Sequence, residues 1–422
     1  MVAANLARKG IKSVLIDGSG RAGHGVAYST QEPAHVLNVR AEVMSAWADD
    51  LEHFVRVAEA EGGNRRDFVQ RRQFGRYLKQ VLADAVEGGN VRVAERQAVE
   101  AKPDGGGWTV RLDDGEQFDA SGLVLAIGNQ PPEPMPFGRD SKRVINNPWG
   151  ADALAGVQDL ASTNEDVLLV GTGLTMVDAV LSLDAAGHRG RMVGLSRRGL
   201  IPRGHTDDMI PAPVEEDQVP FGHVRTLWRW LRKRGAEVGW RSAVDALRPY
   251  SQQIWQSLPP AEQRRFARHA RPWWDVHRHR IAPEVSQRLQ EMIAEGRLEI
   301  VAGRIQSVTD DGRVLSVAYR RRGASSPTEA RFAYMINCTG PLGVISRTRD
   351  RLLKGMLKDG LAKPDPLGIA LDVDEKSRLI GSDRSWAMGP MTKGRYWEII
   401  AVPDIRGQAA AVADDIATEL GR

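Results

Sequence analysis

This sequence has only one cysteine, Cys338, in 422 residues. A single cysteine excludes both an internal disulfide and a Cys-x-x-Cys redox pair. No apolar run approaches the roughly 18 residues of a membrane-spanning helix, so no membrane partner is expected. The first residues also lack a basic segment followed by a long apolar stretch, which argues against a secretory signal. These absences favour a cytoplasmic protein.

A glycine turn is also missing where the surrounding sequence calls for one. Residues 1–10 read as an amphipathic helix that ends at Gly10, and residues 13–16 read as a strand that ends at Asp17. In a Rossmann-like unit, an acid at that strand end binds a ribose hydroxyl, and the preceding helix starts at a G-x-G-x-x-G turn that binds a pyrophosphate. We therefore expect a dinucleotide-binding unit whose first strand and glycine loop are missing. Taken alone, the segment also suits a buried strand with a solvated aspartate.

Charge is distributed unevenly along the chain. The net charge is +4, yet residues 221–280 hold 13 Lys or Arg against 4 Asp or Glu. The same stretch holds six of the 11 tryptophans: Trp228, Trp230, Trp240, Trp255, Trp273 and Trp274. Cations interleaved with aromatic residues suit a nucleic-acid surface, and they equally suit a helical insert that covers an anionic cofactor. Because no known nucleic-acid-binding motif accompanies the charge, we expect no nucleic-acid partner.

Apolar strands that run into glycine or proline turns recur along the chain. They cover residues 13–17, 123–129, 166–170 and 332–341. Shorter β-like pieces with turns at residues 104–107 and 310–312 precede two of these strands, so the same order of elements occurs twice along the chain. Strands that alternate with helices predict an α/β fold with two Rossmann-like dinucleotide-binding domains.

The repeat also predicts the domain boundaries. Residues 1–150 and 330–422 are expected to form one domain, and residues 151–329 the other. Within the second, about 202–290 do not follow the strand pattern. Apolar residues at helical spacing, interrupted by prolines, predict a helical insert there.

The second domain begins with a recognisable nucleotide-binding turn. Gly171-x-Gly173-x-x-Met176 follows a strand and opens a helix, as a dinucleotide turn requires. Met176 replaces the third glycine of the usual pattern, which should loosen the packing of helix on strand. A βα turn that binds no ligand is the alternative.

The next strand, residues 190–195, ends without an acid. Ser196, Arg197 and Arg198 follow it. Hydroxyl and guanidinium groups suit the 2′-phosphate of NADP, whereas a carboxylate would suit NAD. Two solvated arginines are the alternative. Since Asp17 suits FAD, the two units together imply hydride transfer from NADPH to a flavin.

Several motifs together resemble the bacterial family described simply as FAD/NAD(P)-binding proteins. They are Gly23-His24-Gly25-Val26-Ala27-Tyr28-Ser29, Leu37-Asn38-Val39, Gly171 to Asp178, Arg278-His279-Arg280, Ile336 to Pro341, Trp397-Glu398 and Ala401 to Arg406. The combination spans essentially the whole chain. The family is similar, in its two-domain, glutathione-reductase-like plan, to the class B flavin-dependent monooxygenases, which include N-hydroxylating and Baeyer–Villiger enzymes.

The resemblance implies FAD and NADP as cofactors, and it implies which residues contact them. Beyond the strand ends already named, these are Gly23, Gly25, Asn38, Gly128, Gly171, Gly173, Thr175, Gly340, Trp397 and Pro403. Residues 389–406 are expected to pass the flavin ring, with Pro403 opening a final helix; a helix that only packs is the alternative. Family members carry a strand and glycine turn upstream. Met1 is therefore expected to be an internal methionine taken as the start, or else a truncation weakens FAD binding.

The expected function is that of an FAD-dependent NADPH oxidoreductase, by resemblance a monooxygenase with a small-molecule substrate. His205 is the one candidate general acid. The alternatives are a reductase that passes electrons to a quinone or protein, and a non-catalytic NADP-binding or scaffold protein. His277-x-His279 lacks a third ligand, so no metal is expected, and Cys338 is expected to be a buried small side chain. No motif indicates the organic substrate or the oligomeric state.

Overall fold

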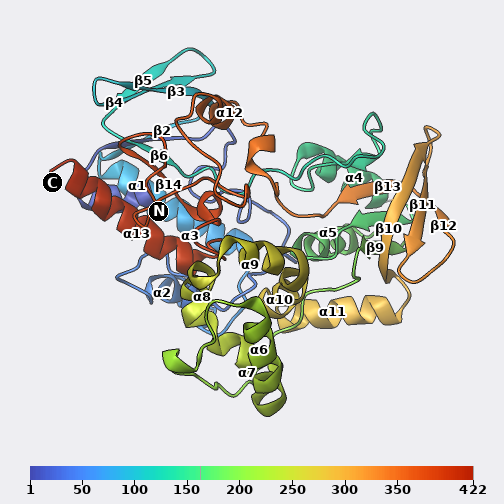
Figure 1. The fold of residues 1–422 in the computed structure, drawn as a ribbon. Coiled ribbons are helices and arrows are strands. Elements are labelled where there is room, and N and C mark those ends of the chain that lie inside the picture. The colour runs from blue at the N-terminus through green and yellow to red at the C-terminus, as the bar shows by residue number, and fades with distance from the viewer. Residues whose placement is uncertain (162, 422) are drawn as a thin grey trace.

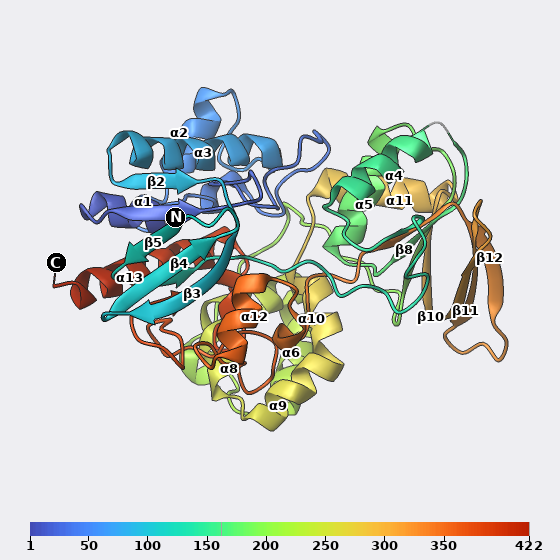
Figure 2. The same ribbon diagram turned by 90° about the horizontal axis from the view of Figure 1, so that it is seen from above.

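The computed structural model describes residues 1–161 and 163–421, and it consists of two α/β units and a helical insert (Figures 1 and 2). The predicted α/β fold with two Rossmann-like units is confirmed. Both ends of the chain contribute to the first unit, where the N-terminal and C-terminal helices lie side by side. The middle of the chain forms a seven-stranded sheet, and the insert lies between the two units.

The first unit contains two short parallel sheets. β1 (Ser13–Ile16) pairs with β2 (Val91–Ala94), and β6 (Leu123–Leu125) pairs with β14 (Ser385–Ala387). Its helices are α1 (Val2–Arg8), α2 (His53–Ala60), α3 (Arg71–Glu87) and α13 (Val402–Glu419). α1 buries Val2, Ala4 and Leu6, and its apolar face packs on α13 because apolar residues recur at helical spacing.

An antiparallel meander completes this unit. It consists of β3 (Ala98–Asp104), β4 (Gly107–Leu112) and β5 (Gln117–Ala120). The turn between β3 and β4 holds Gly105 and Gly106 at φ of +54° and +85°. α12 (Arg351–Lys358) packs on the meander, and Asp350 caps its N-terminus by accepting from the Leu353 N–H.

The second unit is the seven-stranded sheet. Its strand order is β12-β11-β10-β9-β8-β13-β7, in which the last five are parallel. The strands are β7 (Val144–Ile145), β8 (Val167–Val170), β9 (Met192–Ser196), β10 (Leu298–Asp310), β11 (Leu315–Arg321), β12 (Thr328–Phe332) and β13 (Tyr334–Asn337). β7 and β13 lie outside residues 151–329 in sequence but within this sheet in space. Val167, Leu168 and Leu169 are completely buried, as expected for a strand covered on both faces.

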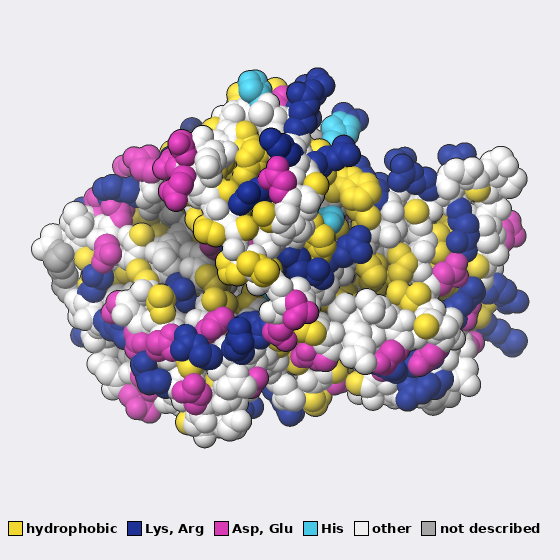
Figure 3. Space-filling view, turned by 90° about the horizontal axis from the view of Figure 1, so that it is seen from below, with side chains coloured by type: hydrophobic (Ala, Val, Ile, Leu, Met, Phe, Trp, Pro, Cys, Tyr) yellow, Lys and Arg dark blue, Asp and Glu magenta, His cyan; other side chains and the backbone are white. Residues whose placement is uncertain are grey.

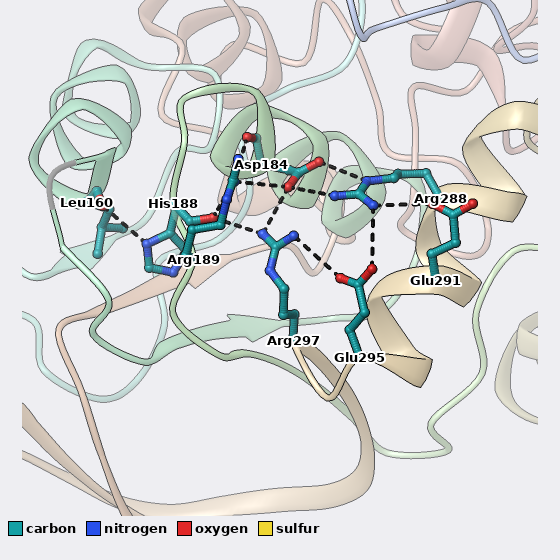
Figure 4. A network of polar contacts seen from close by, with 8 residues as sticks. All are labelled: Leu160, Asp184, His188, Arg189, Arg288, Glu291, Glu295 and Arg297. Atoms are coloured by element: carbon teal, nitrogen blue, oxygen red, sulfur yellow. Dashed lines mark hydrogen bonds and ion pairs between the residues drawn. The ribbon is translucent and has the colours of Figure 1, made fainter.

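Three helices cover this sheet: α4 (Ala151–Ala161), α5 (Leu174–Ala185) and α11 (Pro283–Ala294). Asp184, near the end of α5, accepts two hydrogen bonds of 3.0 Å from Arg288 of α11 and one of 2.9 Å from Arg297 (Figure 4). Burial opposes the ionisation of Asp184, but these hydrogen bonds outweigh it and lower the pKa of the carboxyl. Since α11 packs on the sheet, the insert ends before residue 283 rather than at about 290.

The insert contains the predicted short helices. They are α6 (Val224–Val238), α7 (Trp240–Ala246), α8 (Ser251–Ser257), α9 (Pro260–Arg265) and α10 (Arg271–Arg278). Trp255 and Trp274 are buried in the core of the insert, and Trp228, Trp230 and Trp240 pack against it. The aromatic rings therefore serve mostly as core. Four of the five cations of α6 are exposed, namely Arg225, Arg229, Arg232 and Lys233, and Lys and Arg gather on the face of the insert seen in Figure 3.

Candidate functional site

A cavity of about 1940 Å³ lies where the two units and the insert meet. Ordinary ligand pockets measure about 300–1,000 Å³, so this cavity has room for more than one ligand. Eight of the predicted site residues line it: Asp17, Gly23, Gly25, Asn38, Gly128, Thr175, His205 and Gly340. Seven do not: Gly171, Gly173, Ser196, Arg197, Arg198, Trp397 and Pro403.

Asp17 lies at the carboxyl end of β1, where parallel strands place ligand-binding groups. One carboxylate oxygen, Oδ1, accepts from the Ser19 N–H at 2.7 Å and from the Ser19 hydroxyl at 2.5 Å. No hydrogen bond within the described residues engages Oδ2. Asp17 is thus oriented by its own turn and keeps an oxygen with which to accept from a ligand hydroxyl.

The loops after β1 and β6 and the turn after β13 border the cavity at glycines in the left-handed region. Gly23 and Gly25 have φ of +85° and +61°, and Gly128 and Gly340 have +72° and +89°. A Cβ at Gly128 or Gly340 would meet no atom within 4 Å. Glycine is favoured at these two positions by the left-handed backbone conformation and not by crowding. The space beside the backbone is open at both.

The turn between β8 and α5 combines a crowded glycine with an open one. A Cβ on Gly171, at φ +106°, would lie 2.3 Å from the carbonyl oxygen of Cys338. Gly173 precedes α5 with φ −86°, and a Cβ added there would meet no atom within 4 Å. The helix N-terminus therefore presents its N–H groups beside open space, which suits a phosphate. Met176, predicted to loosen packing, is completely buried in the core.

Ser196 is the last residue of β9, Arg197 and Arg198 follow it, and all three lie outside the cavity lining. The Ser196 hydroxyl accepts from Thr172 Oγ1 at 2.9 Å and from the Gly199 N–H at 3.0 Å, so it ties two turns together. Arg197 is exposed and Arg198 half-buried, and neither makes a hydrogen bond or ion pair with the described residues. Both guanidinium groups are thus free to bind an anion.

Trp397 occupies a different place from the one predicted. Its ring stacks on Trp255 of the insert, with centroids 4.5 Å apart and an interplanar angle of 23°. The neighbouring Glu398 lines the cavity instead. The Trp397 ring lies in the core of the insert, where its burial removes a large apolar area from water. Pro403 lies in the first turn of α13, and Ala401 and Val402 beside it line the cavity.

His205 lines the cavity, but its ring makes a structural contact. Nε2 lies 2.9 Å from the Asn38 carbonyl oxygen, so Nε2 carries the hydrogen and donates. Burial lowers the pKa of the imidazole to about 4, so the ring is neutral at pH 7. His205 therefore joins the start of the insert to the first unit, and this geometry gives no support to a general acid.

Charged residues that sequence reasoning did not single out as site residues also line the cavity. Arg278 Nε lies 3.0 Å from Glu398 Oε2, and the side chains are only 11% and 5% exposed. Glu398 has a φ of +66°, which costs energy in a residue with a side chain. Trp274 Nε1 also donates to this carboxylate. The motifs Arg278-His279-Arg280 and Trp397-Glu398 were the only sequence signals of this arrangement.

Residues 1–130 match the protein family described as FAD-NAD(P)-binding. A search of curated proteins found no match.

Solved structures similar to this chain share its fold over nearly the whole length. L-lysine 6-monooxygenase from Pseudomonas syringae has a TM-score of 0.68 at 15% identity, covering 99% of this chain and 96% of that one. The ornithine N-hydroxylase of Kutzneria sp. 744, with reduced FAD, NADP+ and L-ornithine, has a TM-score of 0.64 at 14% identity, with coverages of 99% and 96%. Thioredoxin reductase from Lactococcus lactis has a TM-score of 0.54 at 15% identity, with coverages of 99% and 95%.

The family match confirms the predicted relation to FAD/NAD(P)-binding proteins and agrees with the predicted cofactor class. The chain as a whole has the fold of flavoproteins with two dinucleotide-binding domains.

Proposed function

We propose that this chain is an FAD-dependent NADPH oxidoreductase that acts as a monooxygenase on a small organic substrate. The observation that carries the proposal is the cavity shared by the two units, which reaches from Asp17 to Thr175 at the start of α5. In this proposal the first unit, which residues 1–150 and 330–422 mostly form, binds FAD, and the second unit, built around residues 151–329 with β7 and β13, binds NADP. Two cofactors in one cavity can place their reactive rings side by side.

The residues of the first unit fit FAD. The free Oδ2 of Asp17 can accept from a ribose hydroxyl, and the glycine loops at Gly25 and Gly128 leave room for a ligand beside the backbone. Ala401 and Val402 start α13 at the cavity wall. The N–H groups of this first helical turn suit the carbonyl edge of a flavin.

The residues of the second unit fit NADP. Open space at Gly173 lets a pyrophosphate approach the N-terminus of α5. Arg197 and Arg198, which have no partner within the described residues, would bind the 2′-phosphate at the far end of the dinucleotide. Thr175, at the start of α5, lines the cavity, and the nicotinamide would enter the cavity beside it.

A flavin held by these residues would supply the chemistry of accepting a hydride from NADPH and passing electrons to an acceptor such as oxygen. The chain itself positions the ligands and restricts water. The insert covers the cavity, and the His205 contact with Asn38 holds it against the first unit. Cys338 is buried, and as the only cysteine it cannot form the dithiol pair that a disulfide reductase uses. This argues against disulfide reduction through a dithiol pair within the chain.

The test begins with the full chain incubated with FAD and freed of unbound flavin. Bound flavin that NADPH bleaches under nitrogen, faster than NADH does, is the expected result. Oxygen uptake without stoichiometric peroxide release, once the right substrate is present, would identify a monooxygenase. Bleaching followed by reduction of a quinone, with no oxygen incorporation into any product, would instead indicate a reductase. A colourless protein that leaves NADPH unchanged would overturn the proposal.

A further inference from the structure

The cavity wall between the insert and residues 398–405 carries several charges, and most of them are paired. Arg280 makes two hydrogen bonds to Asp245, of 2.9 and 3.0 Å, and is 4% exposed. Arg278 forms the ion pair with Glu398 described above. Each of these guanidinium groups is neutralised where it lies.

Arg248 lines the same wall and has no such partner. No hydrogen bond or ion pair within 4.0 Å joins its side chain to any described residue, although the residue is half-buried. Burial lowers the pKa of the guanidinium, yet arginine stays protonated in proteins. The carboxylates of Asp404, Asp245 and Glu398 stabilise this cation only from beyond ion-pair distance, so an anion in direct contact with it would stabilise it further.

The backbone around Arg248 is held firmly in place. Leu247 is completely buried, and the Tyr250 hydroxyl donates to the Val214 carbonyl at 2.9 Å. Pro249 lies between these anchors and fixes its own φ. Arg248 therefore begins a well-anchored 3-10 turn just after α7, and such a fixed backbone suits a residue that binds a ligand.

Asp404, in the first turn of α13, is the nearby acid most able to compete for Arg248. It interacts electrostatically with Arg248, but the two side chains form no ion pair within 4.0 Å. Asp404 Oδ2 is buried with no hydrogen-bond partner among the described residues. Burial raises the pKa of this carboxyl and so disfavours its charged form, which makes Asp404 a poorer counter-ion for Arg248.

We propose that Arg248 is the binding group for the carboxylate of a small organic acid, whose apolar part lies against Ile400, Val402 and Ile405 of the same wall. A guanidinium binds a carboxylate through two parallel hydrogen bonds. The nearby carboxylates of Asp245 and Glu398 would repel a doubly charged phosphate more strongly than a singly charged carboxylate. The inference rests on the proposed function in one respect, namely that the bound acid is the substrate of the oxidoreductase.

The experiment is calorimetric titration of the full chain, without NADPH, against straight-chain carboxylates from acetate to decanoate. Hexylamine and inorganic phosphate serve as comparison probes. At least one carboxylate should bind, its affinity rising with chain length, and neither comparison probe should match it. Arg248→Gln should weaken carboxylate binding at least about tenfold, and Arg248→Lys by less, because charge-assisted hydrogen bonds are lost wholly or in part.

Two matched variants make the result specific. Arg232→Gln removes an exposed, unpaired cation of α6 and should leave carboxylate binding unchanged. Asp404→Asn removes a competing negative charge and should leave binding unchanged or strengthen it. Circular dichroism and thermal melts establish that every variant is folded.

Three outcomes would overturn the inference. They are equal binding by Arg248→Gln and the unmodified chain, no binding of any carboxylate, and an equal loss in Asp404→Asn, which would make Arg248 a partner of that acid. NADPH-dependent flavin reduction is measured separately. Normal reduction without carboxylate binding would contradict this inference alone, and carboxylate binding without reduction would contradict only the proposed function.

Discussion

Arg71 and Asp178 join the two dinucleotide-binding units through a buried, bidentate ion pair. Arg71 is the first residue of α3, and its two terminal nitrogens donate to the two carboxylate oxygens of Asp178 in α5, each at 2.9 Å. The side chains are only 9% and 7% exposed. Arg71 Nε also donates to the Val36 carbonyl at 3.0 Å. The pair thus orients α5, and with it Thr175, against the first unit.

Breaking this pair should destabilise the protein strongly. Asp178→Asn leaves the Arg71 guanidinium buried without its counter-charge, so the free energy of unfolding should fall by about 3–5 kcal/mol. Urea unfolding followed by tryptophan fluorescence measures the change. Glu61→Gln, which breaks the exposed Arg76–Glu61 pair of 2.8 Å, is the matched control. Its effect should stay below about 1 kcal/mol. A loss in Asp178→Asn no larger than in the control would contradict the prediction.

The two glycines before α5 should respond differently to alanine. At Gly171, the backbone at φ +106° and a Cβ 2.3 Å from the Cys338 carbonyl oxygen make alanine costly, by about 2 kcal/mol or more. At Gly173, φ is −86° and the space is open, so alanine should leave the free energy of unfolding nearly unchanged. It should instead raise the KM for NADPH if a pyrophosphate passes there. Thermal melts and steady-state kinetics separate the two effects, and equal stability losses would refute this reading.

Arg197 and Arg198 should set the choice between the two nicotinamide cofactors. The double substitution to glutamine removes both unpaired cations, so the KM for NADPH should rise about tenfold or more. The KM for NADH, which lacks the 2′-phosphate, should stay the same. NADH is the internal control, because a general loss of folding would impair both cofactors. A parallel rise in both KM values would speak against a 2′-phosphate site.

His205 should make stability depend on pH in mild acid. In the unfolded chain the ring takes up a proton below about pH 6.5, whereas in the folded protein it does so only below about 4. Between these values the unfolded state binds more protons, so stability falls as the pH falls. The full contribution above pH 6.5 is about 3 kcal/mol.

Comparison with a His205→Gln variant isolates this effect. Glutamine retains an N–H donor for the Asn38 carbonyl but does not titrate. The difference in free energy of unfolding between the two proteins, measured in urea from pH 4 to pH 7, should shrink as the pH falls. A difference that is constant with pH would show that His205 titrates normally.

Local patterns predicted most of the architecture. The apolar runs at residues 166–170 and 332–337 became adjacent strands β8 and β13, because runs without polar interruption are stable only when covered on both faces. The glycine turns at residues 104–107 and 310–312 became hairpins, since glycine accepts the left-handed conformation. The end of the insert was misjudged, because α11 has the same helical periodicity whether it packs on the sheet or on other helices.

Three of the predicted cofactor-binding residues were recognised from a strand end next to a glycine turn, and their contact with a cofactor stays a prediction. Asp17, Gly128 and Gly340 line the cavity as expected, since the carboxyl ends of parallel strands meet at one edge. Trp397 and His205 make contacts within the protein, and their residue types suit either ligand contact or packing. Their stacking on Trp255 and hydrogen bond to Asn38 depend on segments far away in the sequence.

The sequence by itself determined the α/β class, the two repeated units, the helical insert and the cofactor class, because periodicity and turn chemistry are local properties. Only the tertiary structure decided which charges are paired. Asp178 pairs with Arg71, Glu398 with Arg278 and Asp245 with Arg280, while Arg248 lacks a partner within the described residues. Charged partners that are more than 30 residues apart produce no periodic pattern in the sequence. A buried charge pairs with whichever segment the packing brings within about 4 Å of it.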